Sequence, residues 1–463
     1  MTPTVTARPE LGGRSFGQRL ARLRREARLS QTALAGEEYS PSYISLLEAD
    51  KRTPSDTVIA TLARRLNCSP ALLQTGHPSE RERRLDLELA YSQLALSHGE
   101  PRVAIERLRP LLAESDLDRV RADEATFTLA RAHDQLGETA AVIATLAELH
   151  DRALAAETHL LPSAVGSALC RAYTISGDLY RSLDVGQRAL EASVQRGLGG
   201  TDDYYTLAAT LLWAYHEAGD VGHASTWAHT LIQEVDEQSP PSFGQAAIYW
   251  NAALIAESSG RVDEALHLSR LALARMAEVG GSRNLARLHT VVAVLLVKSN
   301  PPRPAEALAI LDSADGILSD LGGQLDRALW ENARAMALLL TGDLAGARLA
   351  NDRALHRVPA EDHESWSRIL LTAFDIARAD GELDQAMSAY RQTREHLDLL
   401  VANRTTGRLW RDLGDRLRDV ELLDDAANCY ERALDALGMQ DQSLAIRRAS
   451  VRLAGQLGGA RRP

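Results

Sequence analysis

The sequence predicts an all-α protein: a module of five short helices at the N-terminus, followed by a long array of paired helices. Three observations support this prediction. Alanine and leucine dominate the 463 residues while aromatic residues make up 5%, a balance that favours helices over strands. Serines that can cap helices recur through residues 15–76. Beyond them a glycine-centred pattern returns about every 40 residues, as in repeat proteins.

Charge is divided unevenly between the two parts. Residues 1–76 hold eleven basic and seven acidic residues, whereas the whole chain has 52 basic and 63 acidic residues and a net charge of −11. A uniformly basic nucleic-acid-binding protein is therefore excluded, but a local basic module is not. We expect this module to bind an anionic polymer and the acidic body to have a separate role.

The cysteines and the terminal segments indicate a cytoplasmic protein. Cys68, Cys170 and Cys429 are far apart and odd in number, so they offer neither a disulfide framework nor zinc-ligand spacing. The chain has no apolar run of membrane length, and its first residues lack the apolar core of a signal peptide. We expect no membrane contact, a disordered arm at 1–14 and a disordered tail at 456–463.

The second to fifth helices of the N-terminal module each have their own start signal. Four serines are candidate N-caps, two of them followed by proline at the first helical position: Ser30, Ser40, Ser55 and Ser69. The predicted helices are Phe16–Arg28, one beginning at Gln31, Ser42 to about Glu48, Asp56–Leu66, and a fifth turn that ends near Gly76.

The segments LSQTALA, YSPSYISLLEADKRTPS and IATLARRLNCSPALL resemble the lambda-repressor-like (XRE/Cro-type) helix-turn-helix domain, here residues 15–76. The resemblance implies that the third helix enters the major groove of double-stranded DNA. It also implies the DNA-contacting residues: Gln31 at a phosphate, Ser42, Tyr43 and Ser45 at base edges, and Lys51, Arg52 and Thr53 at the backbone. The segment between Ala35 and Ser40 is one residue shorter than usual and lacks the turn glycine before the cap, so this register can shift by one residue.

Other side chains of the module have two interpretations. Arg19, Arg22 and Arg25 form either a phosphate-contacting face, for which Arg19 is our candidate, or a solvated face. Arg24 and Glu48 are predicted to form an ion pair within the module, as in the family. Tyr43 is either a base contact or part of the core.

Residues 77–455 are predicted to form the repeat array. The pattern is a glycine, a small residue five positions on, and alanine or leucine twelve positions on. It occurs at Gly99, Gly137, Gly177, Gly219, Gly260, Gly342 and Gly381, with weaker copies at Pro302 and Glu421. In each unit the glycine ends one helix through a left-handed turn, and the small residue lets the next helix pack closely. Since neither helix can bury its face alone, the units stack into an α-solenoid.

The spacing resembles the tetratricopeptide repeat, in about nine helical hairpins with a period longer than the usual 34; a HEAT-like solenoid is the alternative. The positions eight residues before each turn are nearly all apolar and are predicted core. The positions six residues before each turn hold a mixture of polar, charged and apolar residues, as expected of an exposed groove. The candidate ligand-binding residues lie on this second surface: Arg131, Arg171, Trp213, Trp250, Asn251 and Asn332. The tryptophans have an alternative role as core between repeats.

A helix-turn-helix domain followed by a tetratricopeptide array resembles the bacterial peptide-responsive (RRNPP-type) regulators. That resemblance implies a homodimer that binds operator DNA and a short peptide, with asparagines holding the peptide backbone and the units around 380–455 contributing to the dimer. The alternative is an array that binds proteins and has no small ligand. We find no phosphate-binding loop, catalytic constellation or metal motif, and expect neither enzymatic activity nor a cofactor. His216, His223 and His229 are either a metal or pH-sensing cluster or ordinary solvated residues.

Overall fold

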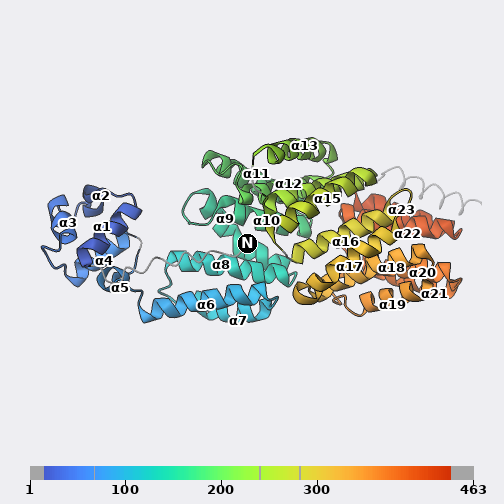
Figure 1. Ribbon diagram of the computed structural model, residues 1–463, viewed down its shortest axis with the longest axis horizontal. Helices are drawn as coiled ribbons and strands as arrows, with labels where there is room; N and C mark the ends of the chain where they lie inside the picture. Colours follow the sequence, from blue (N-terminus) through green and yellow to red (C-terminus); the bar gives the residue numbers. More distant parts are fainter. Residues whose placement is uncertain (1–14, 67, 239–240, 281–282, 439–463) are drawn as a thin grey trace, which may run out of the picture. The chain divides into compact units, whose positions relative to one another are not determined.

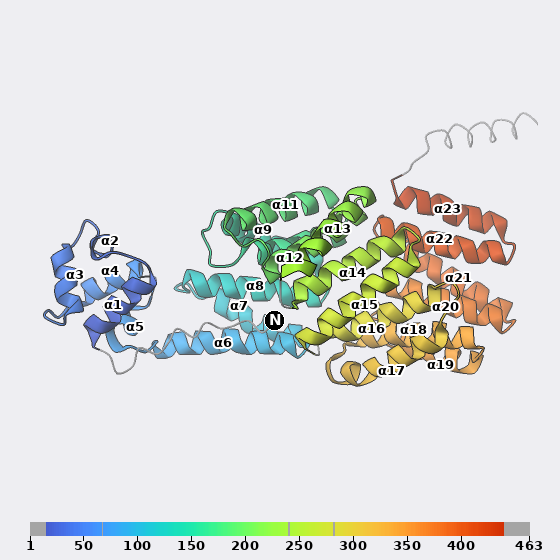
Figure 2. The same ribbon diagram turned by 45° about the horizontal axis from the view of Figure 1, so that its top comes forward.

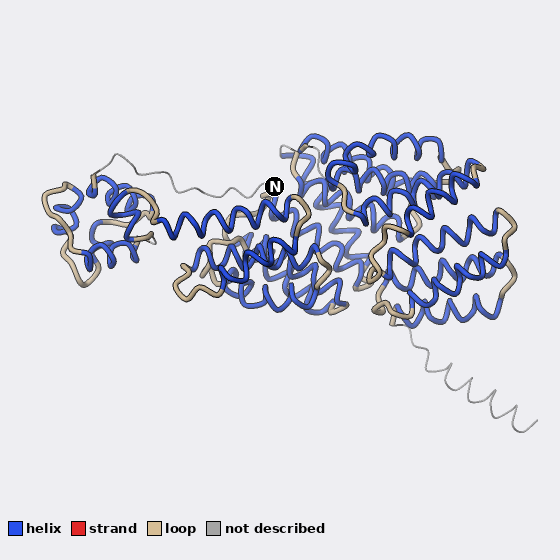
Figure 3. Tube along the Cα trace, turned by 90° about the horizontal axis from the view of Figure 1, so that it is seen from below, coloured by secondary structure: helices blue, strands red, loops and turns tan. Residues whose placement is uncertain are grey.

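The computed structural model describes residues 15–66, 68–238, 241–280 and 283–438. These residues form 23 helices and no strands (Figures 1 and 3). The chain divides into two compact units, 1–132 and 133–463, each of which is considered by itself below. The arm and the tail expected at the two ends lie outside the described residues.

The N-terminal module contains five helices: α1 (Phe16–Glu26), α2 (Gln31–Ala35), α3 (Pro41–Glu48), α4 (Asp56–Arg65) and α5 (Pro70–Thr75). All four predicted serine caps are confirmed, because each side chain accepts a hydrogen bond from a backbone N–H in the first turn of its helix. Helix α1 ends two residues earlier than predicted, since Arg28 adopts a left-handed conformation with φ of 55°.

Two glycines give this module its shape. Gly36 follows α2 with φ of 58°, so the turn glycine stands directly after α2 rather than before the cap of α3. Gly17 lies where α1 crosses the end of α3, and a Cβ atom there would come within 2.5 Å of the carbonyl oxygens of Leu47 and Glu48. Only glycine permits this close approach.

The rest of the first unit comprises α6 (Glu80–Ser97), α7 (Pro101–Leu112) and most of α8 (Arg119–Gln135). The second unit continues with paired antiparallel helices (Figure 2). Their bounds are α9 (Thr139–Leu154), α10 (Pro162–Ser176), α11 (Leu179–Gln195), α12 (Asp202–Glu217), α13 (Val221–Gln238), α14 (Phe243–Ser258), α15 (Val262–Val279), α16 (Arg283–Lys298), α17 (Pro304–Leu321), α18 (Gln324–Thr341), α19 (Leu344–Leu355), α20 (His363–Ala379), α21 (Leu383–Leu397), α22 (Arg404–Asp419) and α23 (Leu423–Ala436).

The predicted turns separate the two helices of each pair. All seven predicted turn glycines have positive φ, between 74° and 86°, a conformation that glycine adopts without steric cost. The weaker copy at Glu421 keeps the same turn, with φ of 64° in a residue that has a side chain. The small residue five positions after each turn is buried throughout the array, for example Ala265, Ala347 and Ala386 at 0% exposure. The paired-helix solenoid is therefore confirmed.

The core of the second unit runs between the stacked pairs. Its largest apolar cluster extends from α12 to α18, and a second cluster joins α20 to α23. The row eight residues before each turn is mostly core, as predicted, with Leu169, Leu211 and Leu413 buried. Tyr91 departs from this row with half of its side chain exposed.

Candidate DNA-binding face and cross-array cluster

The outward face of α3 carries Ser42 and Ser45, both exposed. Ser40 and Pro41 start the helix, while Ile44 and Leu47 anchor its opposite face with no exposed surface. The sequence therefore presents the two hydroxyls away from the core because they lie out of phase with the apolar positions.

Tyr43 is half-buried and packs beside Tyr39, with 5.7 Å between ring centroids. The Arg52 guanidinium lies over the Tyr43 ring at 5.8 Å. Lys51, Arg52 and Thr53 are all exposed directly after α3. The C-terminal end of α3 thus lies beside the positive charges of Lys51 and Arg52. These charges would attract the phosphate backbone of DNA.

Glu48 organises the buried side of this face. Its carboxylate accepts hydrogen bonds from Arg24 Nε at 2.6 Å and from Gln31 Nε2 at 2.7 Å. Burial alone would raise the pKa of Glu48, but the bonds from Arg24 and Gln31 outweigh it and hold the pKa below its usual range. Arg24 and Glu48 are therefore an ion pair within the module, as predicted, and the Gln31 amide is held beside them.

Arg19 requires a correction. Only 6% of the residue is exposed, and its guanidinium donates hydrogen bonds to the carbonyl oxygens of Leu73 and Gln74 at the end of α5. Burial lowers the pKa of Arg19. A buried side chain that ties α1 to α5 has no access to a DNA phosphate, so Arg19 is structural.

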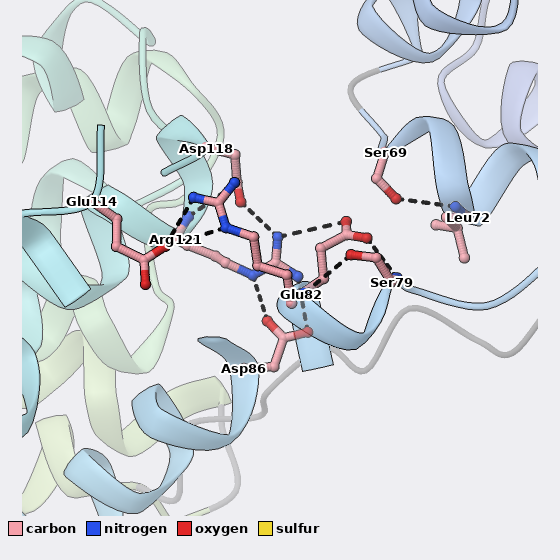
Figure 4. Close-up of polar contacts among 9 residues, drawn as sticks. Ser69, Leu72, Ser79, Glu82, Asp86, Glu114, Asp118 and Arg121 are labelled. Atoms are coloured by element: carbon pink, nitrogen blue, oxygen red, sulfur yellow. Dashed lines mark hydrogen bonds and ion pairs between the residues drawn. The ribbon is translucent and has the colours of Figure 1, made fainter. Parts of the chain in front are cut away.

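A polar joint connects the module to the first repeat (Figure 4). Ser79 and Glu82 form a capping box at the start of α6, and Ser69, the N-cap of α5, lies close enough to help lower the pKa of Glu82. Arg121 on α8 donates hydrogen bonds to both carboxylate oxygens of Asp86, at 2.6 and 2.8 Å. It donates a third to Asp118 at 2.6 Å. Arg121 Nη1 lies 4.0 Å from Glu82. Helices α6 and α8 therefore share a polar network, and the start of α5 lies beside it.

The candidate ligand-binding residues have different surroundings. Arg131 and Arg171 are exposed, and Arg171 pairs with Asp134 at 3.2 Å. Trp250 is half-buried against the largest core cluster, which fits its alternative role as core between repeats. The Asn251 amide donates to the carbonyl of Ala247 in its own helix.

Asn332 on α18 is 7% exposed, and its Oδ1 has no hydrogen-bond partner among the described residues. Such a buried acceptor is costly when it stays unsatisfied. Among the predicted ligand-binding residues whose partners the structure describes, Asn332 is the one with a buried side-chain oxygen that accepts no hydrogen bond.

Trp213 lies beside a polar cluster that joins distant repeats, and this cluster was not predicted. We name it the cross-array cluster; its members are Glu217, Glu257, Lys298, Arg368, Thr405 and Arg408. They come from α12, α14, α16, α20 and α22, which are all first helices of their pairs. Thr405 donates a hydrogen bond to Glu217 at 3.4 Å, and nearby Trp213 opposes the rise in the pKa of Glu217 that burial causes.

The cross-array cluster brings α22 against helices that lie far away in sequence. Arg408 bonds Glu257 at 3.3 Å, and Lys298 bonds the same carboxylate oxygen at 2.8 Å. Burial would raise the pKa of Glu257, but Lys298 and Arg408 outweigh it and lower the pKa. Arg368 pairs with Glu364 at 2.8 Å, with 41% of its side chain accessible, and it lies close enough to Glu257 to help lower the pKa of that carboxyl.

The three neighbouring histidines do not behave as one set. His216 is 2% exposed, and burial lowers its pKa to about 4, with Arg404 and Arg408 adding to the effect. His223 and His229 are exposed on α13, so the expectation of solvated histidines is wrong for His216. No group of three or more His, Cys, Asp or Glu side chains in the described part of the chain is arranged to hold a metal ion.

Repeat spacing alone could not reveal the cross-array cluster. Glu217 and Glu257 lie near the ends of their helices, whereas Arg368, Thr405 and Arg408 lie near the starts of theirs. These positions have no common place in the 40-residue unit. The only sequence signal is the polarity of isolated positions in apolar helices, which many solvated residues share.

Residues 15–75 match the family described as a helix-turn-helix domain. The chain thus has an N-terminal domain of this DNA-binding class, followed by a repeat array. None of the helices that the structure describes has both the length and the apolar character required to cross a membrane. No curated protein matches the chain.

Several solved structures are similar to the chain. A Rap protein complexed with Competence and Sporulation Factor matches with a TM-score of 0.50 and 13% identity, over 78% of this chain and 99% of that one. Bacillus thuringiensis PlcR, in complex with the peptide PapR7 and DNA, matches with a TM-score of 0.36 and 13% identity, over 66% and 94%. NprR from B. thuringiensis matches with a TM-score of 0.39 and 13% identity, over 77% and 100%. At this identity the likeness to the Rap protein concerns the fold alone.

Proposed function

We propose that this protein is a transcriptional regulator that binds operator DNA as a homodimer and responds to a short peptide bound by its array. The observation that carries the DNA-binding part is the exposed α3 face in a helix-turn-helix domain, with Lys51 and Arg52 beside it. One such module contacts few bases, so a dimer on two half-sites about 34 Å apart is required for specificity.

Charge reversal tests the DNA-binding face. Lys51→Glu combined with Arg52→Glu should weaken binding to all sequences and reduce the salt dependence by about one unit of slope per lost phosphate contact. The control is Arg83→Glu with Arg102→Glu, which changes the same charge at exposed positions of α6 and α7. Gel shifts with undiminished binding after deletion of residues 1–76 would contradict the proposal.

The last described helix supports dimerisation through the C-terminal units. Leu423, Leu434 and Leu437 are 64%, 42% and 44% exposed. Their spacing places them on one face of α23 and its final turn. Residues 439–455, which belong to the same prediction, lie outside the described residues. Leu423→Glu with Leu434→Glu should yield monomers in sedimentation, whereas Leu349→Glu on α19, where the leucine is 53% exposed, should not. A dimer of unchanged affinity would count against this interface.

Asn332 supports peptide binding. A peptide N–H could satisfy the unused Oδ1 of Asn332, and an amide side chain offers both a donor and an acceptor to a peptide unit. Asn332→Ala with Asn251→Ala should leave folding and unliganded DNA binding intact while abolishing saturable binding from a random peptide library. Loss of thermal stability with peptide binding retained would show that both asparagines are structural.

A protein-binding scaffold is the second candidate, and one observation favours it. Leu87, Tyr91 and Leu94 are each at least half exposed on α6 and share a helical face. A contiguous apolar stripe of this kind is typical of a protein-interaction surface. If peptides fail to bind but Leu94→Asp prevents capture of a protein partner, the scaffold function is favoured.

A further inference from the structure

The outward face of α3 contains an apolar side chain at its centre. Leu46 is 39% exposed. It shares that face with Ser42, Ser45 and Ala49, which lie four, one and three residues away and are also exposed. An exposed leucine on a helix that is otherwise anchored through Ile44 and Leu47 is not required for the core, because those two residues are fully buried.

The other side chains of α3 have little capacity to distinguish bases. Glu48 is occupied by Arg24 and Gln31, and Tyr43 is half-buried between Tyr39 and Arg52. The exposed polar groups on this face are therefore two serine hydroxyls. A hydroxyl can both donate and accept, so it contacts several base edges and discriminates weakly.

We propose that Leu46 determines specificity by packing against thymine methyl groups in the major groove, an inference that rests on the proposed DNA-binding function. Thymine is the only ordinary base that presents a methyl group there, and apolar side chains recognise it by contact. The short serine side chains on either side permit close approach of the helix. The nearby cations of Lys51 and Arg52 favour DNA over an apolar protein surface as the occupant of this face.

The experiment begins with the full-length protein and a pool of random-sequence duplexes. The selected half-site should contain a thymine at one or two fixed positions. Uracil, which has the same hydrogen-bonding edge and lacks the methyl group, then replaces each thymine in turn. Replacement at the contacted position should weaken binding about three- to fivefold, the effect of one buried methyl group. Replacement at the other thymines should have no effect.

Leu46→Ala should show the same weakening on thymine-containing DNA and lose the discrimination between thymine and uracil. Leu349→Ala on α19 is the matched control, because it truncates an exposed leucine outside the module. Since the uracil scan uses the unaltered protein, it is decisive even if the variant folds poorly.

Selected DNA that tolerates uracil at every position would overturn the role of Leu46 and leave DNA binding intact. Discrimination that persists in Leu46→Ala would overturn it as well. Failure to select any DNA would instead overturn the proposed DNA-binding function, and this inference with it.

Discussion

Glu48 links three helices of the N-terminal module through three hydrogen bonds, two from Arg24 and one from Gln31. Its partners, Arg24 on α1 and Gln31 on α2, hold α3 in place from the side opposite the candidate DNA-binding face. The ion-paired side chains are only 14% and 10% exposed, so their mutual attraction is weakly screened. The orientation of α3 therefore depends on a carboxylate that does not itself face solvent.

Removing this carboxylate should loosen the module. We expect Glu48→Ala to destabilise it by about 3 kcal/mol, because the Arg24 charge is left buried without its partner. Hydrogen exchange in peptides from residues 15–75 measures the local loss, and exchange in the array should not change. Glu26→Ala, which removes an exposed partner of Arg22, should cost well under 1 kcal/mol. Equal effects of the two variants would contradict the role of Glu48.

His216 should make the stability of the array dependent on pH. Its pKa in the folded state is about 4, against 6.5 ordinarily, so the unfolded chain binds the proton more readily. The contribution of neutral His216 to the free energy of unfolding should therefore be fully present above about pH 6.5 and be lost as the pH falls toward 4. Between pH 7 and pH 5 this one residue should account for about 2 kcal/mol.

Comparison with His216→Gln isolates this contribution from all other titrating groups. The variant should show a smaller loss of unfolding free energy between pH 7 and pH 5, measured from urea transitions of the array. His223→Gln is the control, since that histidine is exposed on α13. Parallel pH profiles for the unaltered protein and His216→Gln would show that His216 does not titrate as described.

At the scale of elements, the start of α6 combines two roles. Glu82 completes the capping box with Ser79, and it also reaches Ser69 at the start of α5. The cap that stabilises the first repeat helix thus also ties that helix to the module. Arg121 extends the tie to α8 through Asp86 and Asp118.

Glu82→Ala should therefore destabilise the connection between the module and the array. We expect a loss of about 1 kcal/mol from the cap and faster proteolytic cleavage in the linker at residues 76–79. Glu80→Ala changes a neighbouring exposed carboxylate of the same helix turn and should leave cleavage near its original rate. If linker cleavage is unchanged in Glu82→Ala, the contact with Ser69 does not restrain the linker.

At the scale of the second unit, α22 closes the array by contacts that span up to 188 residues of sequence. Thr405 bonds Glu217, and Arg408 bonds Glu257. These bonds join first helices that belong to non-adjacent repeats. A solenoid held only by nearest neighbours could bend freely along its length, whereas these contacts restrain its curvature.

Arg408→Glu should open the array, because it places a second carboxylate beside Glu257. We expect a larger radius of gyration in small-angle X-ray scattering and a loss of about 1 kcal/mol in stability. Arg411→Glu reverses the charge of an exposed arginine one turn further along α22 and serves as the control. Raised salt should produce part of the same expansion in the unaltered protein, since it screens accessible ion pairs. Identical scattering curves for both variants would exclude a closing role for Arg408.

Local signals in the sequence were sufficient to predict the helices, their serine caps and the turns between the paired helices. A serine cap, a proline at a first helical position or a glycine in a left-handed turn acts within a few residues, so its effect does not depend on the rest of the fold. Glu421 shows that the repeat can keep this turn without glycine, since its φ is 64°. The Arg24–Glu48 pair was also predictable, through a family resemblance in that short module.

Long-range packing decided the rest. Arg19 lay on the same stripe of basic residues as candidate phosphate contacts, but α5 folds back over it and buries it. Trp250 and Asn332 met the spacing expected of a groove, yet their exposure depends on how the neighbouring pairs stack. The cross-array cluster arises from the accumulated rotation of successive repeats, which brings α22 to α12 and α14. No single unit encodes that rotation, because each small interhelical angle adds to the next along the array.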